Sequence, residues 1–123
     1  MTVGVAIKEV DLLMPNDINN QIKIDWLKRL DMQLTDEIVN THKKPEGYET
    51  PNFDDYDVTT NMVVDELHAD LYIPYLRMKI AQAQMESERY QMEYTNFNNQ
   101  LITYRNYYNR KYMPITKAVP KYR

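Results

Sequence analysis

The sequence predicts an all-α fold: a small bundle of about four helices with a long acidic loop and an extended C-terminal tail. Only two of the 123 residues are glycine, which argues against short strands joined by tight turns. Apolar side chains recur at steps of three and four over long stretches, the spacing of one helix face. The length fits one domain, which we place at residues 1–113, with a basic tail at 114–123.

The first predicted helix is short and spans residues 5–14. Its apolar residues fall near one face: Val5 or Ala6, Val10, Leu13 and Met14. Pro15 ends it, because proline disfavours the helical conformation in the residue before it. Asn16 or Asp17 is then expected to cap the second helix by accepting a backbone N–H.

The second predicted helix spans residues 18–41 and is amphipathic. Charged residues, among them Lys23 and Asp31, are expected on its solvent face. The apolar stripe steps by one, three or four along Ile22, Trp26, Leu27, Leu30, Leu34, Ile38 and Thr41.

Residues 43–60 are expected to form a loop. Pro45, Gly47 and Pro51 interrupt any helix, and five acidic residues lie between positions 46 and 57. A loop of this length in a small domain is usually functional or mobile. Three aromatic residues are candidates for pinning it in place, with a neighbouring subunit as one possible surface: Tyr48, Phe53 and Tyr56.

The third predicted helix spans residues 65–84, with Asp65 as its expected N-cap. Pro74 leaves two alternatives open. Either the helix kinks there, or a first turn ends near Tyr72 and Pro74 opens the next one. The expected buried face comprises Leu71, Tyr72, Tyr75, Leu76, Ile80 and Ala83.

The fourth predicted helix spans residues 87–112 and ends before Pro114. Its mostly aromatic stripe follows heptad spacing: Tyr90, Tyr94, Phe97, Leu101, Tyr104, Tyr108 and Tyr112. A single helix from Pro74 to Tyr112 would be too long to bury its stripe against the second helix alone. We therefore expect a turn around Gln84 to Ser87, with Ser87 as N-cap, and a helical hairpin.

Charge is divided unevenly along the chain. Residues 1–100 contain nine basic and eighteen acidic residues, whereas residues 101–123 contain six basic residues and no acid. An acidic body with a cationic end suits head-to-tail contact between subunits. The candidate interface residues are Tyr48, Phe53, Tyr56, Tyr107, Arg110, Lys111, Ile115, Lys117, Val119, Lys121, Tyr122 and Arg123.

Several function classes find no support in the residues. The absence of cysteine excludes disulfides, thiolate metal sites and cysteine nucleophiles. No phosphate-binding loop, GxSxG or HExxH sequence is present, so we expect no enzyme activity and no cofactor. His68 near Asp65 supplies too few ligands for a metal site. No apolar run reaches ~18 residues, so no transmembrane helix is expected.

The order of landmarks along nearly the whole chain, about residues 5–114, carries a family resemblance. The landmarks are Val10-Asp11, Pro15-Asn16, the Trp/Leu helix, the acidic loop, Leu71-Tyr72, Tyr75-Leu76, Tyr90, Phe97-Asn98, Tyr107-Tyr108-Asn109-Arg110 and Met113-Pro114. This order resembles the small head–tail connector (adaptor, or head-completion) proteins of tailed bacteriophages, particularly those infecting low-GC Gram-positive hosts. Pro74 departs from the usual pattern, as does Gln84-Met85 in place of the family's common Asn-Gly turn.

The resemblance implies a structural virion protein without enzymatic activity. Its subunits would form a ring, usually of twelve, beneath the portal protein at the capsid vertex. That ring would extend the channel through which DNA passes and would offer a docking surface to a tail or stopper protein. The implied location is the neck of the virion, after assembly in the host cytoplasm. The alternative is a small nucleic-acid-binding or regulatory protein, in which residues 104–123 and the aromatic stripe stack on bases.

Overall fold

The computed structural model describes residues 1–44, 46–49 and 52–112, and the predicted all-α class is confirmed there. The predicted tail at 114–123 lies outside these residues. An isolated antiparallel bridge joins Thr2 to Asn61. The elements in chain order are α1 (Val3–Leu13), α2 (Asn20–Glu37), the 3-10 turns η1 (Val39–Thr41) and η2 (Ala69–Leu71), α3 (Tyr72–Ala83) and α4 (Ser87–Lys111).

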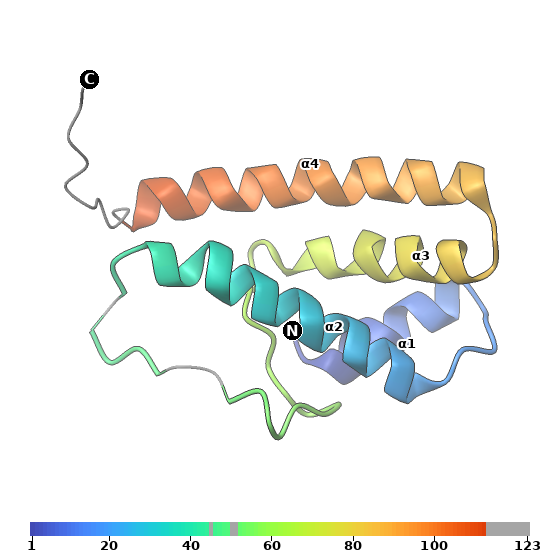
Figure 1. The fold of residues 1–123 in the computed structure, drawn as a ribbon, viewed down its shortest axis with the longest axis horizontal. Coiled ribbons are helices and arrows are strands. Elements are labelled where there is room, and N and C mark those ends of the chain that lie inside the picture. The colour runs from blue at the N-terminus through green and yellow to red at the C-terminus, as the bar shows by residue number, and fades with distance from the viewer. Residues whose placement is uncertain (45, 50–51, 113–123) are drawn as a thin grey trace.

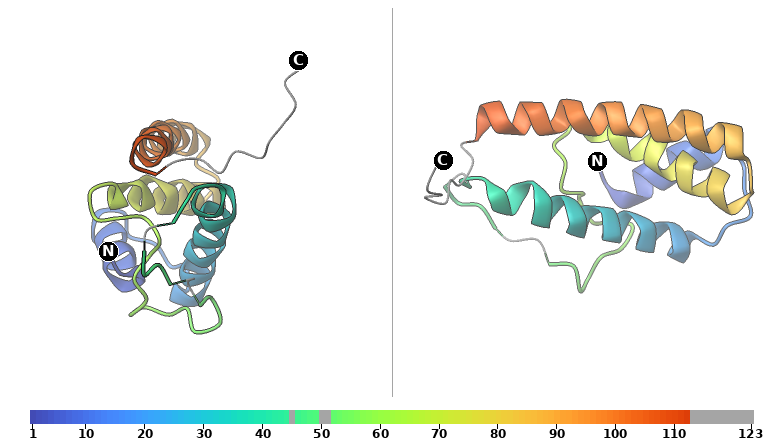
Figure 2. Two further views of the ribbon diagram at one scale, coloured as in Figure 1. Left: turned by 90° about the vertical axis from the view of Figure 1, so that its left-hand side faces the viewer. Right: turned by 45° about the horizontal axis from the view of Figure 1, so that its top comes forward.

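The helices form three layers, with α3 in the middle (Figures 1 and 2). α4 runs antiparallel to α3 along one side, whereas α1 and α2 pack against α3 on the other side. A helix covered on both sides should be apolar around most of its circumference. α3 has this character, since eight of its residues are buried: Tyr72, Ile73, Pro74, Tyr75, Leu76, Met78, Ile80 and Ala81.

α1 begins two residues earlier than predicted, because Thr2 caps it by accepting from the Val5 backbone N–H. Its buried residues are Val3, Ala6, Ile7 and Val10. The prediction that Leu13 faces the core is wrong, because the helix ends there and the following Met14 turns into the core instead.

α2 is capped by Asn19, not by Asn16 or Asp17: the Asn19 side chain accepts from the Gln21 N–H at 2.7 Å. The helix ends at Glu37, and the predicted last turn is the separate η1. Two further predictions for this helix are wrong: that Ile22 belongs to the buried stripe, and that Lys23 and Asp31 face solvent.

Ile22 is 46% exposed, whereas the charged residues Lys23 and Asp31 are buried. A buried charge is tolerated only with a partner. Lys23 has one, because its Nζ donates to Asp11 on α1 at 2.8 Å.

The third helix begins later than predicted, and Asp65 does not cap it. Instead the 3-10 turn η2 leads directly into α3. Pro74 is therefore the third residue of α3, in the first turn, where a backbone N–H would have no helical partner. The structure therefore has the second of the two alternatives for Pro74: a short turn, η2, comes first, and the proline lies in the first turn of the helix that follows.

The predicted turn between the last two helices is confirmed and occupies Gln84 to Glu86. The Glu86 N–H donates to the Ala81 carbonyl and the Met85 N–H to the Gln82 carbonyl, which is the Schellman arrangement. Ser87 is the first helical residue and not the cap. Met85 has a φ of 59°, the left-handed conformation that favours glycine.

Replacing Met85 by glycine should therefore stabilise the protein by about 0.5–1 kcal/mol, since glycine adopts this conformation without the clash of a Cβ. The Met85 side chain is exposed, so little packing is lost. Urea denaturation monitored by circular dichroism measures the difference. As a control, Gln82→Gly inside α3 should destabilise by about 1 kcal/mol. Equal effects of the two glycines would contradict the role assigned to Met85.

Candidate interaction surface at the tyrosine-rich end of the bundle

The aromatic stripe of α4 faces the core through most of its length. Tyr104 and Tyr108 are buried, and four further residues of the stripe pack against the core while partly exposed: Tyr90, Phe97, Leu101 and Tyr112. Tyr94 is the exception. It is 47% exposed, so its predicted place in the seam is wrong. The spacing of Tyr94 puts it at the edge of the stripe, beyond the width that α3 covers.

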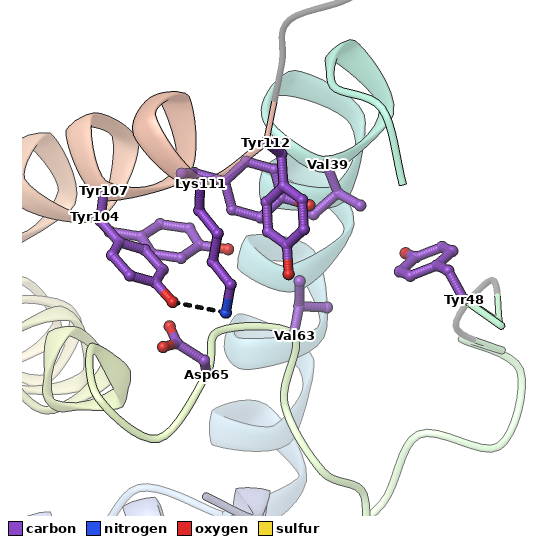
Figure 3. A pocket seen from close by; sticks show the side chains of 9 residues that line it. Val39, Tyr48, Val63, Asp65, Tyr104, Tyr107, Lys111 and Tyr112 are labelled. Atoms are coloured by element: carbon purple, nitrogen blue, oxygen red, sulfur yellow. Dashed lines mark hydrogen bonds between the residues drawn. The ribbon is translucent and has the colours of Figure 1, made fainter. Parts of the chain in front are cut away.

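The C-terminal end of α4 borders a groove of about 180 Å³. Figure 3 shows the side chains that converge there from α4, from η1, from the segment before η2 and from the acidic loop. The lining residues are Val39, Tyr48, Val63, Asp65, Tyr104, Tyr107, Tyr108, Lys111 and Tyr112. Five of the nine are tyrosines, which combine an apolar ring with a hydroxyl and are enriched at protein interfaces.

Polar groups of the groove contact one another and the aromatic rings beside them. Lys111 Nζ donates to the Tyr107 hydroxyl at 3.0 Å and lies over the rings of Tyr107 and Tyr112, 5.5 Å from each centroid (Figure 3). The hydrogen bond to Tyr107 raises the pKa of Lys111. Burial raises the pKa of Tyr108 to about 12, so its phenol is protonated at neutral pH. The groove thus offers aromatic faces, hydroxyls, one ammonium and the carboxylate of Asp65.

Two histidines support the groove, and both roles escaped the sequence analysis. His68 contacts Asp65 at 3.2 Å and stacks on Tyr107, with 4.3 Å between ring centroids. His42 is buried, with Nε2 2.6 Å from Asn109 Oδ1 and its ring edge-on to Tyr108. The His68–Tyr107 and His42–Asn109 contacts join residues about 40 and 67 positions apart, so no local pattern predicts them.

The acidic loop is anchored to α2 of the same chain. The Tyr56 hydroxyl donates to Asp31 of α2 at 2.7 Å, and Phe53 packs beside Tyr56, with 6.2 Å between ring centroids. Asp31 also accepts from the Tyr72 hydroxyl of α3 at 2.5 Å and from the Val63 N–H at 3.3 Å. One buried carboxylate therefore holds α2, α3 and the loop together.

Burial raises the pKa of Asp31 from 3.8 to about 6, even though its three hydrogen bonds act in the opposite direction. Because the folded-state pKa exceeds the unfolded one, the protonated carboxyl favours the fold. This contribution is complete below pH 3.8 and is lost as the pH rises through about 6.

Asp31 should therefore make the protein more stable at pH 5 than at pH 7, by about 1 kcal/mol. Urea unfolding at both pH values measures the change. Other groups titrate in this range, so the quantity to compare is the pH dependence of the native chain against that of Asp31→Asn, which carries no titrating group at this position. Identical pH dependence in the two proteins would contradict this assignment.

The candidate interface residues from the sequence divide into four groups. Tyr48, Tyr107 and Lys111 meet in the groove. Tyr56 bonds to Asp31 instead, and Phe53 packs beside Tyr56. Arg110 is exposed on α4 and does not line the groove. Six residues lie outside the described part of the chain: Ile115, Lys117, Val119, Lys121, Tyr122 and Arg123.

Within the described residues, no three His, Cys, Asp or Glu side chains gather as metal ligands would. Across the same residues, every helix is too short or too polar to traverse a bilayer. Comparisons with family models, curated proteins and solved structures returned no match.

Proposed function

We propose that this chain is a structural assembly protein of the head–tail connector type, which forms a ring beneath a portal and joins a phage capsid to its tail. The proposal draws on the resemblance of residues 5–114 to that family and on the helical fold. The structural observation that carries it is the partly open, tyrosine-lined groove at the end of α4. Such a groove suits the binding of another protein segment better than it suits chemistry on a small substrate.

The uneven distribution of charge along the chain indicates how subunits would contact one another. Tyr112 lines the groove, and the basic segment at 114–123 lies shortly after it in the sequence. The described loop presents exposed carboxylates at Asp54, Asp55 and Asp57. In the proposed ring, the basic segment of one subunit meets the acidic surface of the next, and the contact closes by rotation.

The decisive experiment mixes the protein with its candidate portal protein and examines the product by native mass spectrometry and negative-stain imaging. A ring of subunits on the portal is the expected result. Deleting residues 114–123 should abolish assembly at physiological salt. Intact assembly by the truncated chain would refute the head-to-tail contact, and a persistent monomer that binds DNA instead would refute the connector function.

The groove itself is tested by a matched pair of tyrosines on α4. Tyr107→Ala removes a groove wall and should weaken association with the portal or with neighbouring subunits about tenfold, a loss typical of a central aromatic contact. Tyr94→Ala truncates an exposed tyrosine outside the groove and should leave association unchanged. Equal affinities of the two variants in a sedimentation or interferometry assay would show that the groove is not the contact.

Part of the stacking platform that the nucleic-acid alternative requires is buried in this fold. Tyr104 and Tyr108 are buried, and Arg105 pairs with Glu37 at 3.2 Å. Stacking on bases needs exposed aromatic faces beside free cations. A salt titration separates the readings: DNA binding through the basic end should fall steeply with salt, whereas a connector subunit should bind DNA weakly at any salt concentration.

A further inference from the structure

The outer face of α4 has an unusual composition. Within the described part of the chain, α4 packs mainly against α3 and η2 and also contacts Glu37, His42 and the groove residues on the same inner side, so the opposite side of the helix faces solvent. The residues on that side step by three and four: Glu88, Met92, Thr95, Asn99, Ile102, Asn106 and Arg110. We call this row the outer stripe. Within it, charged residues occur only at the two ends, Glu88 and Arg110. All seven residues are exposed.

The middle of the outer stripe is suited to burial. Met92 is 55% exposed and Ile102 is 49% exposed. The Thr95 hydroxyl donates to the Gln91 carbonyl within the helix at 3.0 Å, so the hydroxyl needs no outside partner. Thr103, which flanks the stripe, donates in the same way to the Asn99 carbonyl at 3.0 Å. Interface cores are depleted of charge in this manner, whereas charged residues make up 27% of the chain as a whole.

The ends of the outer stripe indicate what covers it. Glu88 lies in the first turn of α4 and Arg110 in the last turn. If two copies of α4 pack antiparallel about Asn99, then Glu88 of each copy lies opposite Arg110 of the other. The same register places Met92 opposite Asn106 and Thr95 opposite Thr103. A parallel pairing would instead set Glu88 against Glu88.

We propose that two copies of this chain associate through their outer stripes, as an antiparallel, two-fold symmetric pair of α4 helices centred on Asn99. At the axis, the two Asn99 amides face one another and hydrogen-bond, as a buried asparagine does when it fixes the register of a coiled coil. Antiparallel packing also opposes the two helix dipoles favourably. The contact involves one helix per subunit, so the dimer is weak and depends on concentration.

This dimer is a property of the free chain and is independent of the proposed connector function. A two-fold contact pairs one surface with itself, whereas a closed ring of equivalent subunits uses two different surfaces. The groove lies on the inner side of α4, toward η1 and the loop, and the outer stripe lies on the opposite side. Loss of one contact therefore leaves the other measurable.

Sedimentation velocity over a range of protein concentrations tests the association. The native chain should shift from monomer to dimer as its concentration rises. Ile102→Lys should weaken the dimer at least tenfold, whereas Val5→Lys, a matched substitution at an exposed apolar residue of α1, should leave it unchanged. A chain that stays monomeric throughout would overturn the proposal, as would an equal loss in the two variants.

Charge exchange tests the pairing of the ends. Glu88→Lys alone should weaken the dimer because two cations then face each other at both ends. Adding Arg110→Glu to the same chain should restore it, since each new lysine then meets a new glutamate. Failure of the double variant to regain affinity, while it stays as helical as the native chain, would refute the antiparallel register.

The absence of cysteine from the chain permits a direct measurement of geometry. Asn99→Cys places two thiols together at the axis, so mild oxidation should link the dimer rapidly. Glu88→Cys places them roughly 33 Å apart, 22 residues along paired helices at 1.5 Å per residue, so the same treatment should not link it. Equally fast linking of both variants, or of neither, would overturn the proposal.

Discussion

Asp31→Ala should destabilise the protein by about 3–5 kcal/mol, a large share of the stability of a domain of this size. The substitution removes the shared acceptor of three donors from three parts of the chain: the Tyr72 hydroxyl, the Tyr56 hydroxyl and the Val63 N–H. Asp31 is only 1% exposed, so water does not readily replace the carboxylate. Each buried donor left without an acceptor costs about 1–3 kcal/mol.

The measurement is urea or thermal unfolding of Asp31→Ala beside Asp36→Ala, a matched change at an exposed aspartate of the same helix. Asp36→Ala should change stability by less than about 0.5 kcal/mol. Proteolysis adds a local readout, since the loop should be cut faster once Tyr56 loses its anchor. Similar stability of the two variants would show that Asp31 does not hold the loop to the bundle.

Tyr72→Phe separates the parts of this network. It removes the donor to Asp31 and also the acceptor of the Val64 N–H at 3.0 Å, while the ring stays in place. The expected loss is about 2 kcal/mol, smaller than that of Asp31→Ala because Asp31 keeps two donors. A loss equal to that of Asp31→Ala in the same unfolding assay would show that Tyr72 carries the whole network.

Asp31 also shows where sequence reasoning fails. Its position follows the buried steps of Leu27 and Leu34, so periodicity alone places it on the core face. Its charge favours the solvent face in a prediction from sequence. The hydrogen-bond partners that make its burial tolerable, Tyr56 and Tyr72, lie 25 and 41 residues away. Lys23 was misplaced for the same reason. Local spacing reports which face a residue occupies, but only the tertiary partner explains why a charge is tolerated there.

The elements that could be predicted are those with a long, regular pattern. The repeat of α4 and the turn before it follow from spacing and from the limited surface that one helix can cover. The start of α3 could not be predicted, because the 3-10 turn η2 depends on packing and not on a cap at Asp65. The groove was found only in part: Tyr107 and Lys111 share a helix, but Val39 and Val63 meet them only in the folded chain.

Tyr104→Ala should destabilise the protein by about 3–5 kcal/mol, the cost of truncating a large buried aromatic side chain. Tyr104 is fully enclosed near the C-terminal end of α4, where it contacts the rings of His68 and Tyr108. The other contacts at this end of α4 are the ion pair of Arg105 with Glu37 and the contacts of His42 with Tyr108 and Asn109, so Tyr104 provides much of the buried packing there. The loss should therefore loosen the last turns of α4 before the rest of the bundle.

The matched variant is Tyr94→Ala, which makes the same chemical change on the same helix at an exposed site. It should cost less than about 1 kcal/mol. Hydrogen exchange locates the effect: Tyr104→Ala should lower protection in the second half of α4 more than in α1 and α2, because the carboxylate of Asp31 still joins α2 to α3 there. Uniform loss of protection throughout the bundle would show instead that α4 and the other helices unfold as one unit, and that the groove cannot open without global unfolding.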